Sequence, residues 1–408
     1  MLPSGPRWKS HILRPEVPTK RKVAIYYCDP IKCLQSLLSH PLFAPHISFV
    51  PRKVWTSAAR IVRVYEEWLS GNHAWNLQNQ ILNGASLLGV VLSSDKTNIS
   101  VMSGNRMAHP LLLSIANIDA DVRSKRSLHA HILLALLPIA SFIHKTTRVR
   151  SLLSDHLVHE GLNFVLKPLK VAAAVGIMMS DPIGNLHYCF TPLIAYIADT
   201  PEQCLLAGVP TTKTLDQIER GCAEANPNNF EEFLKVCRCL FLNGVHKPFW
   251  HDWALCDPSI FLPPEWCILV VGPEELDYQF SLIQTPVGYR SFAEGISKLK
   301  QVTGRDHRAV QRYIIGAIAG AVPAKFLAAI VALLDFHYLA QMPHFDDNTL
   351  HRVKAALCAF HTNKAAIITA GGRQGSRGPL DHWEVPKLEL HQQNQGSLSS
   401  AGQYWTVL

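Results

Sequence analysis

Two aspartates of the sequence each follow an apolar run of the kind that forms a buried strand. Asp95 ends the run LLGVVLSSD, and Asp199 ends the run PLIAYIAD. Rigid neighbouring strands can hold two carboxylates close enough to share Mg²⁺ ions about 3.5–4 Å apart, as metal-assisted phosphoryl transfer requires. Mg²⁺ takes oxygen ligands, commonly one or two carboxylates together with substrate phosphates and water. The pair therefore predicts a metal-dependent site; the alternative is that each aspartate only caps a turn.

The elements that would position these aspartates follow an α/β order. Short continuous apolar runs are typical of central strands that are buried on both faces. Strands are expected near 87–92, 99–102, 111–115 and 193–198, and helices over 53–69, 122–137, 148–174 and 215–242. The order of three strands, a helix and a later strand suits a ribonuclease-H-like core, in which the first acid lies on the first strand and the second on the fourth.

Charge and composition divide the chain into four segments. Residues 1–22 hold six basic residues and one acid, and they predict a flexible basic arm. We expect the core with its helical insertion over 23–265, a helical region over 266–370, and a tail rich in Gly, Gln and Ser over 371–408. The predicted fold class is therefore α/β, with a ribonuclease-H-like core, a helical insertion and a largely helical C-terminal region.

The composition argues against several classes of protein. With 48% hydrophobic and 17% charged residues, most of the chain is not expected to be disordered. The N-terminus lacks the apolar core of a secretory signal, and ten irregularly spaced cysteines predict reduced thiols inside a cell. Residues 314–334 approach the length of a membrane span, but Pro323 and Lys325 interrupt them, and a charge at that depth costs about 2.5–3.5 kcal/mol. Two buried helices that meet at Val322-Pro323 are expected instead.

Three further groups of residues carry weaker signals. A zinc site could be assembled around Cys237 and Cys239, but C-x-C is not the C-x₂₋₄-C spacing of structural zinc, so unligated thiols are the preferred interpretation. Lys20-Arg21-Lys22 could serve nuclear import, although such clusters are common. A basic stretch offers charges for DNA phosphates, with a solvated helix face as an equal alternative. Its residues are Lys298, Lys300, Arg305, Arg308 and Arg312.

Four long runs of the sequence closely resemble Plavaka-type transposases, which belong to the CACTA-like DNA transposons of basidiomycete fungi. The runs are LLGVVLSSDKTNISVMSGNRMAHPLLLSIANI, PLIAYIADTPEQCLLAG, NGVHKPFWHDWALCDP and GPEELDYQFSLIQTPVGYRSFAEGISKLKQVTGRDHRAVQRYI. The resemblance implies a ribonuclease-H-like core that cuts and joins DNA with an acidic triad and a divalent metal. Asp95 of SSDKTN and Asp199 of IADTPEQ match the first two acids, so the resemblance implies that both are catalytic and bind Mg²⁺ or Mn²⁺.

The sequence departs from the family that it resembles in two places. Relatives have a short His-rich and acidic segment where Glu265 here joins Trp266 directly. We expect that segment to have carried the third metal-binding acid. Glu274, Glu275 and Asp277 lie nearby, as does Glu265, but no spacing selects one of them. Relatives also begin with a zinc-binding DNA-recognition element that has no counterpart here, so the sequence is interpreted as a truncated or degenerate copy.

The function expected from the sequence is that of a transposase-derived protein of DD(E/D) type. It would act in the nucleus on the DNA of transposon ends with Mg²⁺ or Mn²⁺, and its strand cleavage and transfer would be impaired by the loss of the third acid. The alternative is a catalytically inactive DNA-binding or interaction protein. No membrane partner is expected, and the sequence leaves both enzymatic activity and homo-oligomer formation open.

Overall fold

The chain is a mixed α/β protein that divides into two compact units. Residues 1–265 belong to the first unit, and residues 266–391 form the second. The computed structural model describes residues 6–98, 107–198, 200–207, 214–240, 242–256, 273–283, 291–292, 294–296, 304–320, 322–342, 344–372, 374–375, 378–379, 381 and 383.

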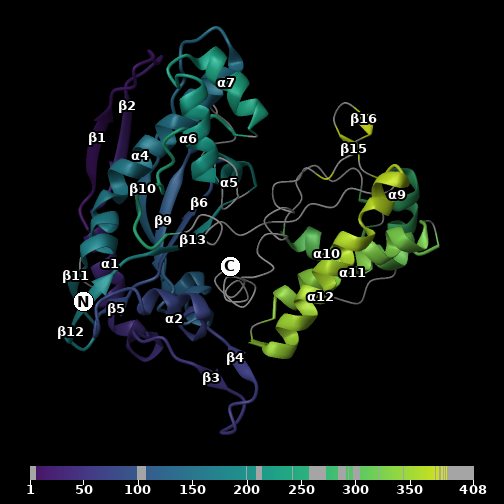
Figure 1. The fold of residues 1–408 in the computed structure, drawn as a ribbon, viewed down its shortest axis with the longest axis horizontal. Coiled ribbons are helices and arrows are strands. Elements are labelled where there is room, and N and C mark those ends of the chain that lie inside the picture. The colour runs from purple at the N-terminus through teal and green to yellow at the C-terminus, as the bar shows by residue number, and fades with distance from the viewer. Residues whose placement is uncertain are drawn as a thin grey trace. The chain divides into compact units, whose positions relative to one another are not determined.

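A six-stranded sheet forms the centre of the first unit, in the strand order β1-β2-β10-β9-β6-β13 (Figure 1). Its strands are β1 (Lys9–Leu13), β2 (Val23–Tyr27), β6 (Val90–Ser94), β9 (Pro110–Ile115), β10 (Ile132–Leu136) and β13 (Leu193–Ile197). β13 pairs with β6 in parallel, and the other neighbouring pairs are antiparallel. The two strands that lead to Asp95 and Asp199 are therefore direct neighbours that run in the same direction.

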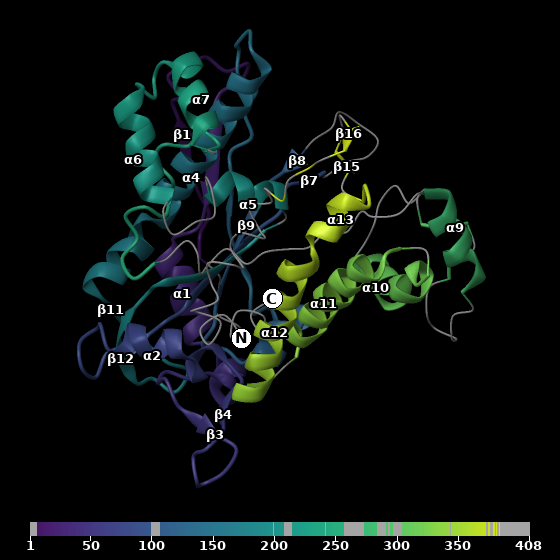
Figure 2. The same cartoon turned by 45° about the vertical axis from the view of Figure 1, so that its right-hand side comes forward.

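Helices cover one face of this sheet. α1 (Pro30–Leu38) and α4 (Thr147–Val175) lie across it (Figures 1 and 2). Their apolar residues share a core with alternate residues of the strands, such as the fully buried Ile25 and Leu92. The helix α4 packs closely on the sheet at Gly161, where an added Cβ would lie only 3.2 Å from Ile25 Cδ1. Each buried Leu or Ile side chain stabilises the fold by about 1.5–3 kcal/mol, so this core fixes the strands in place.

The opposite face is covered where β6 and β13 begin. There η2 (Trp68–Ser70) and α2 (Asn72–Gln78) contribute to a second core, in which Trp68 and Ala195 are buried together. A Cβ at Gly89 would lie only 2.7 Å from the Trp68 ring, so a larger residue here would force the ring to shift. The second core thus fixes the position of the N-terminal ends of both strands.

Smaller elements complete the first unit. β12 pairs with β11 in antiparallel and with β5 in parallel, and the pairs β3–β4 and β7–β8 are antiparallel. Their bounds are β3 (Val54–Trp55), β4 (Arg63–Tyr65), β5 (Ser86–Leu87), β7 (Thr97–Asn98), β8 (Met107–Ala108), β11 (Ile177–Ser180) and β12 (Leu186–Phe190). The remaining helices are η1 (Pro41–His46), α3 (Ala120–Arg123), η3 (Arg126–Leu128), α5 (Thr200–Ala207), α6 (Thr214–Glu224) and α7 (Phe230–Cys239).

The second unit is largely helical where it is described. Figures 1 and 2 show α11 and α12 side by side. Its elements are α9 (Pro273–Leu282), α10 (Gly304–Ile318), α11 (Ala324–Ala340), β14 (Phe345–Asp346), α12 (Asp347–Asn363), α13 (Ala365–Thr369), β15 (Gln374–Gly375) and β16 (Gly378–Pro379). The apolar run 314–334 is divided as predicted, because α10 ends at Ile318 and Pro323 caps the start of α11. Among the described helices, none combines the length and the apolar composition that a membrane span requires.

The structure differs from the sequence-based predictions in four segments. The helix expected over 215–242 is divided into α6 and α7, with residues 225–229 between them. Residues 53–69, expected to be a helix, form β3, β4 and η2, and Arg60 between the strands has a left-handed φ of 54° that no helix tolerates. Residues 122–137, also expected to be a helix, contain the end of α3, then η3 and the strand β10. The run ILLAL forms β10 because it pairs with β2 and β9. Part of the basic arm is also not flexible, since residues 9–13 form β1 against β2. The strand expected at 99–102 lies outside the described residues.

Candidate functional site

β6 and β13 end at the same edge of the central sheet, which we call the strand-end edge. In their parallel register Ser93 lies opposite Ile197. Asp95 comes directly after β6 and is exposed. Asp199 follows Ile197 by two positions in the sequence and lies outside the described residues. The structure therefore places Asp95 at this edge and brings the strand that leads to Asp199 beside it.

Four buried side chains form a hydrogen-bonded cluster at this edge, which we call the Glu202 cluster. It consists of Ser94 on β6, Tyr196 on β13, His109 just before β9, and Glu202 in the first turn of α5, and none is more than 7% exposed. Ser94 Oγ lies 2.9 Å from the Tyr196 hydroxyl and donates to the Glu202 carboxylate. His109 Nε2 lies 2.5 Å from Glu202 Oε1. Glu202 on α5 is thus bonded to β6 and to the residue before β9, and Ser94 links it to β13.

The proton positions in this cluster follow from its geometry. Ser94 has a single hydroxyl proton and gives it to Glu202, so the Tyr196 hydroxyl must donate to Ser94. Burial, followed by the charge of Glu202, raises the pKa of Tyr196, and the phenol therefore keeps that proton. A buried carboxylate without donors would be costly, and the serine and the histidine supply them. The cluster is therefore a rigid support for the loop that begins at Asp95.

The helix α5, which begins directly after Asp199, is held at both ends. At its start Gln203 donates to the carbonyl of Ala198 at 2.7 Å. At its end His159 Nε2 lies 3.0 Å from the carbonyl oxygen of Leu205, and the indole of Trp250 donates to that of Leu206 at 2.8 Å. Together with Glu202, these bonds fix α5 against α4 and the sheet.

The run NGVHKPFWHDW has a structural role in this chain. The side chains of Phe249, Trp250 and Trp253 are buried in the main core. Trp253 donates to the carbonyl of Thr191 at 3.0 Å, just before β13, and the backbone N–H of Phe249 donates to His159 Nδ1 at 3.0 Å. His159 thus uses both ring nitrogens in its neutral form, and burial lowers its pKa to about 4. The run anchors β13 and α5 to α4.

An acid with altered proton affinity lies on α4. Burial raises the pKa of Asp155 to about 6, although the charges of Arg148 and Lys96 oppose the shift. Lys96 directly follows Asp95, so Asp155 lies within electrostatic range of the loop that carries Asp95. Carboxyl groups with a pKa near neutrality are enriched at functional sites, although structural networks produce them too. Asp155 is therefore a candidate member of this site.

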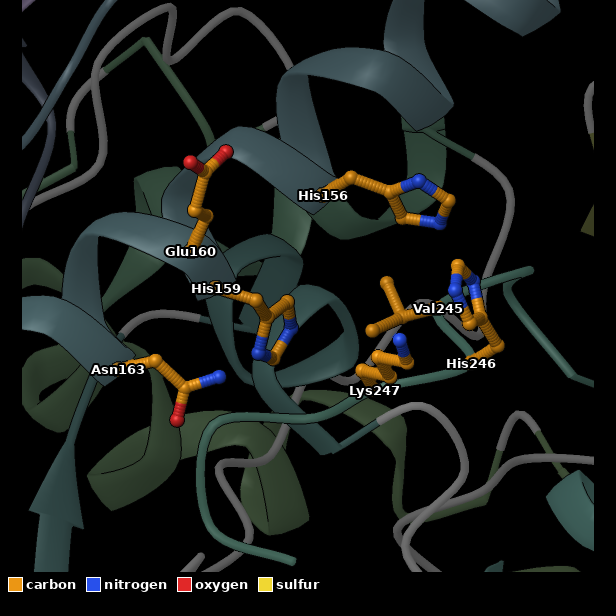
Figure 3. A pocket seen from close by; sticks show the side chains of 7 residues that line it. All are labelled: His156, His159, Glu160, Asn163, Val245, His246 and Lys247. Carbon is orange, nitrogen blue, oxygen red and sulfur yellow. The ribbon is translucent and has the colours of Figure 1, made fainter. Parts of the chain in front are cut away.

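A pocket of about 260 Å³ lies between α4 and the residues that follow α7, and it does not include Asp95 (Figure 3). It is lined by His156, His159, Glu160, Asn163, Val245, His246 and Lys247. The rings of His156 and His246 meet edge to face, with centroids 5.0 Å apart. Burial lowers the pKa of both histidines, and that of His246 falls to about 4. Both therefore stay neutral at pH 7, and His156 Nε2 is already within 2.9 Å of the Gly244 carbonyl.

The metal expected from the sequence has one described ligand candidate at the strand-end edge. Asp95 is an exposed carboxylate, which suits a cation such as Mg²⁺ that retains water ligands. Within the described residues, no group of three or more His, Cys, Asp or Glu side chains is arranged to hold a metal ion. The donor chemistry of Asp95 fits Mg²⁺, and a fuller ligand set would need Asp199. For the weaker zinc hypothesis, burial raises the pKa of the Cys237 thiol to about 11, which disfavours the thiolate that zinc requires.

The other predicted site residues lie in or beside the second unit. Lys298 and Lys300 fall outside the described residues, as does the side chain of Arg305. Arg308 and Arg312 are exposed on α10. A role of these five residues in DNA binding stays a prediction.

One of the four acids near the Glu265–Trp266 junction has a described side chain. Asp277 on α9 accepts the backbone N–H of Ile296 at 2.7 Å. Glu265 lies outside the described residues, and so do the side chains of Glu274 and Glu275.

The sequence did not reveal the Glu202 cluster or Asp155. Glu202 lies three residues after Asp199, and Ser94 directly precedes Asp95, so proximity to the two aspartates was the available signal. Burial and pairing with His109 arise only when β6, β9 and β13 come together.

The strand-end geometry can be compared with known proteins. No curated protein matches the chain. A family model described as Plavaka transposase matches residues 1–267, a range that contains the whole central sheet, α4, α5 and both aspartates. Because the match spans more than half of the sequence, the chain belongs to the Plavaka transposase family.

Proposed function

We propose that this chain is a transposase-derived protein of DD(E/D) type that binds the DNA of transposon ends. The observation that carries the proposal is the pairing of β6 with β13. These parallel neighbours end in register, and Asp95 and Asp199 follow their ends in the sequence. Membership in the transposase family supports DNA as the substrate.

The strand order supports a ribonuclease-H-like core. β6, β9 and β10 form three consecutive antiparallel strands, and β13 returns in parallel on the other side of β6. The long helix α4 lies between β10 and β13 in the chain and packs on the sheet. This is the arrangement in which the first and fourth strands of such a core carry the first two acids.

The reaction that follows from this arrangement is metal-dependent cleavage and transfer of a DNA strand. Asp95 and Asp199 would hold Mg²⁺ or Mn²⁺, which when bound activates water or a 3′-hydroxyl group and stabilises the leaving oxygen. The chain itself supplies position. The Glu202 cluster and the anchored α5 hold the segments on which both aspartates lie, and the exposure of Asp95 leaves it open to a phosphate group.

We expect this activity to be weak, because Glu265 joins Trp266 where an acidic segment would supply the third ligand. The same junction favours a second candidate function, that of a catalytically inactive DNA-binding protein. Either function places the protein in the nucleus, and the exposed cluster Lys20-Arg21-Lys22 supports import.

The proposal is tested by nicking of labelled transposon-end DNA in Mg²⁺ or Mn²⁺. We expect slow nicking that is lost in Asp95→Asn and Asp199→Asn. Asp216→Asn is a matched control, because this aspartate is exposed on α6. Activity that survives Asp95→Asn would refute the catalytic assignment, and DNA binding without nicking in any variant would support the inactive alternative.

A further inference from the structure

The edge strand β1 and its neighbour β2 turn one face to α4 and the other to solvent. On the α4 side, His11 stacks on Phe164 with ring centroids 4.2 Å apart, and Tyr27 meets the same ring edge-on at 5.3 Å. Successive side chains of a strand point to opposite faces, so Ile12 and Tyr26 point away from α4. They are 55% and 51% exposed. An exposed aromatic and aliphatic face at this end of the sheet suggests a contact surface.

The register of the sheet places Tyr26 level with Asp95. Tyr26 lies opposite Leu136 on β10, and Leu136 lies opposite Pro110 on β9. Asp95, the residue after Ser94 at the end of β6, continues this row beside Pro110. Neighbouring strands lie about 4.8 Å apart, so three steps separate Tyr26 from Asp95 by about 14 Å. Both are exposed at the same height of the sheet.

The hairpin of β1 and β2 continues past the strand-end edge. From Tyr26 the strand β2 runs back to Val23 and the tip at 14–22, about 13 Å beyond the row at 3.3 Å per residue. The tip carries four exposed basic side chains and a single acid, Glu16. The basic residues are Arg14, Lys20, Arg21 and Lys22, and within the described part of the chain none of them forms an ion pair. A concentrated positive charge therefore lies beyond the same edge of the sheet as Asp95, three strands to the side of β6.

Charge and exposed rings together select the occupant of this face. Unpaired basic side chains attract phosphates of any sequence. Trp8, which is 48% exposed, directly precedes β1 and lies two residues before Ser10, the strand partner of Tyr26. Continued alternation along the strand would put it on the same face. Aromatic side chains beside such charge stack on bases, and only unpaired bases offer their faces for stacking.

We propose that Trp8, Ile12 and Tyr26, with the basic tip at 14–22, form a binding face for single-stranded DNA that leads the strand to Asp95. This inference deepens the proposed function and rests on it, because DNA is the substrate of that function. The tip holds phosphates, and the rings of Trp8 and Tyr26 stack on bases. The row from Tyr26 to Pro110 directs the DNA strand to the strand-end edge.

The charged part of the face is tested with the full chain and a fluorescein-labelled 20-nucleotide single strand, by anisotropy between 50 and 300 mM KCl. The triple variant Lys20→Gln, Arg21→Gln, Lys22→Gln should weaken binding at least about tenfold. It should also reduce the slope of log Kd against log salt by about 2, since each lost phosphate contact removes about 0.7. Lys235→Gln with Arg238→Gln on α7 is the control, because both side chains are exposed there in the same unit, and it should leave both values unchanged.

The aromatic part is tested by Tyr26→Ala, which should weaken binding about tenfold without changing the salt slope, and by Tyr26→Trp, which should restore it. Bromodeoxyuridine in the strand should crosslink to peptides that contain Trp8 or Tyr26 in the unmutated chain. The inference is overturned if the hairpin variants bind like the control, if the crosslinks map elsewhere, or if a duplex of the same sequence binds more tightly. Binding and nicking are read separately. Loss of nicking with hairpin-dependent binding refutes only the proposed chemistry, and nicking with hairpin-independent binding refutes only this face.

Discussion

Replacing His109 with leucine should destabilise the first unit strongly, because it removes a donor from the buried carboxylate of Glu202. His109 is 4% exposed and Glu202 is 7% exposed, so water cannot take the place of the lost donor. Leaving a buried charged group short of a hydrogen-bond donor costs about 3 kcal/mol. For a domain of this size, each kcal/mol lowers Tm by about 2–4 °C, so we expect a fall of about 10 °C.

A double-mutant cycle in urea, followed by circular dichroism, tests the reason for this loss. His109→Leu combined with Glu202→Met should be less destabilising than the sum of the two single changes by about 2 kcal/mol, because the pair is replaced by apolar side chains of similar volume. His46→Leu is the matched control. Its pair with Asp119 spans 3.3 Å but is exposed, so its loss should cost at most about 1 kcal/mol. Additive single changes, or a cost for His109→Leu equal to that of the control, would refute the role of the cluster.

Three further changes follow from the described contacts. Between pH 6.5 and 4 the chain should lose about 3 kcal/mol of stability through His159. The folded-state pKa of this residue, about 4, lies below its ordinary value, so the unfolded chain takes up the proton first. The urea midpoint of His159→Gln should therefore change less over this pH range than that of the unmutated chain. Asp155 changes stability in the opposite direction, because its pKa is raised in the folded chain and its contribution to stability is lost as pH rises towards 6. Asp155→Asn should therefore raise Tm at pH 7.5 and raise it less at pH 4.5. Equal gains at the two pH values would contradict the raised pKa. Gly89→Ala should cost about 1–3 kcal/mol in chemical denaturation, because its Cβ would lie 2.7 Å from the Trp68 ring, and an unchanged urea midpoint would show that the ring can move.

The parts of the fold that the sequence predicts well are those with strong local signals. The runs before Asp95 and Asp199 are continuous and apolar, and they form the neighbouring strands β6 and β13. The helical pattern over 148–174 corresponds to α4, and Pro323 divides the apolar run of the second unit. In each case a local feature, either length of the apolar run or the fixed backbone of proline, decides the outcome.

The parts that the sequence did not predict depend on distant partners. The apolar run ILLAL reads equally as helix or strand, and only its position between β2 and β9 makes it β10. The Glu202 cluster is a stronger case, because Ser94, His109 and Glu202 are separated by up to 108 positions and meet only through strand pairing. Without the register of the sheet, each of these residues is an ordinary polar side chain.

The proposal that Asp95 and Asp199 share one metal site is tested most directly by substituting Fe²⁺ for Mg²⁺ and mapping the oxidative cuts that the bound iron makes in the backbone of the full chain. We expect cuts near both aspartates, suppressed together by excess Mg²⁺ and lost together in Asp95→Asn. Cuts near only one of the two, or cuts that persist in Asp95→Asn, would contradict a shared site at the strand-end edge.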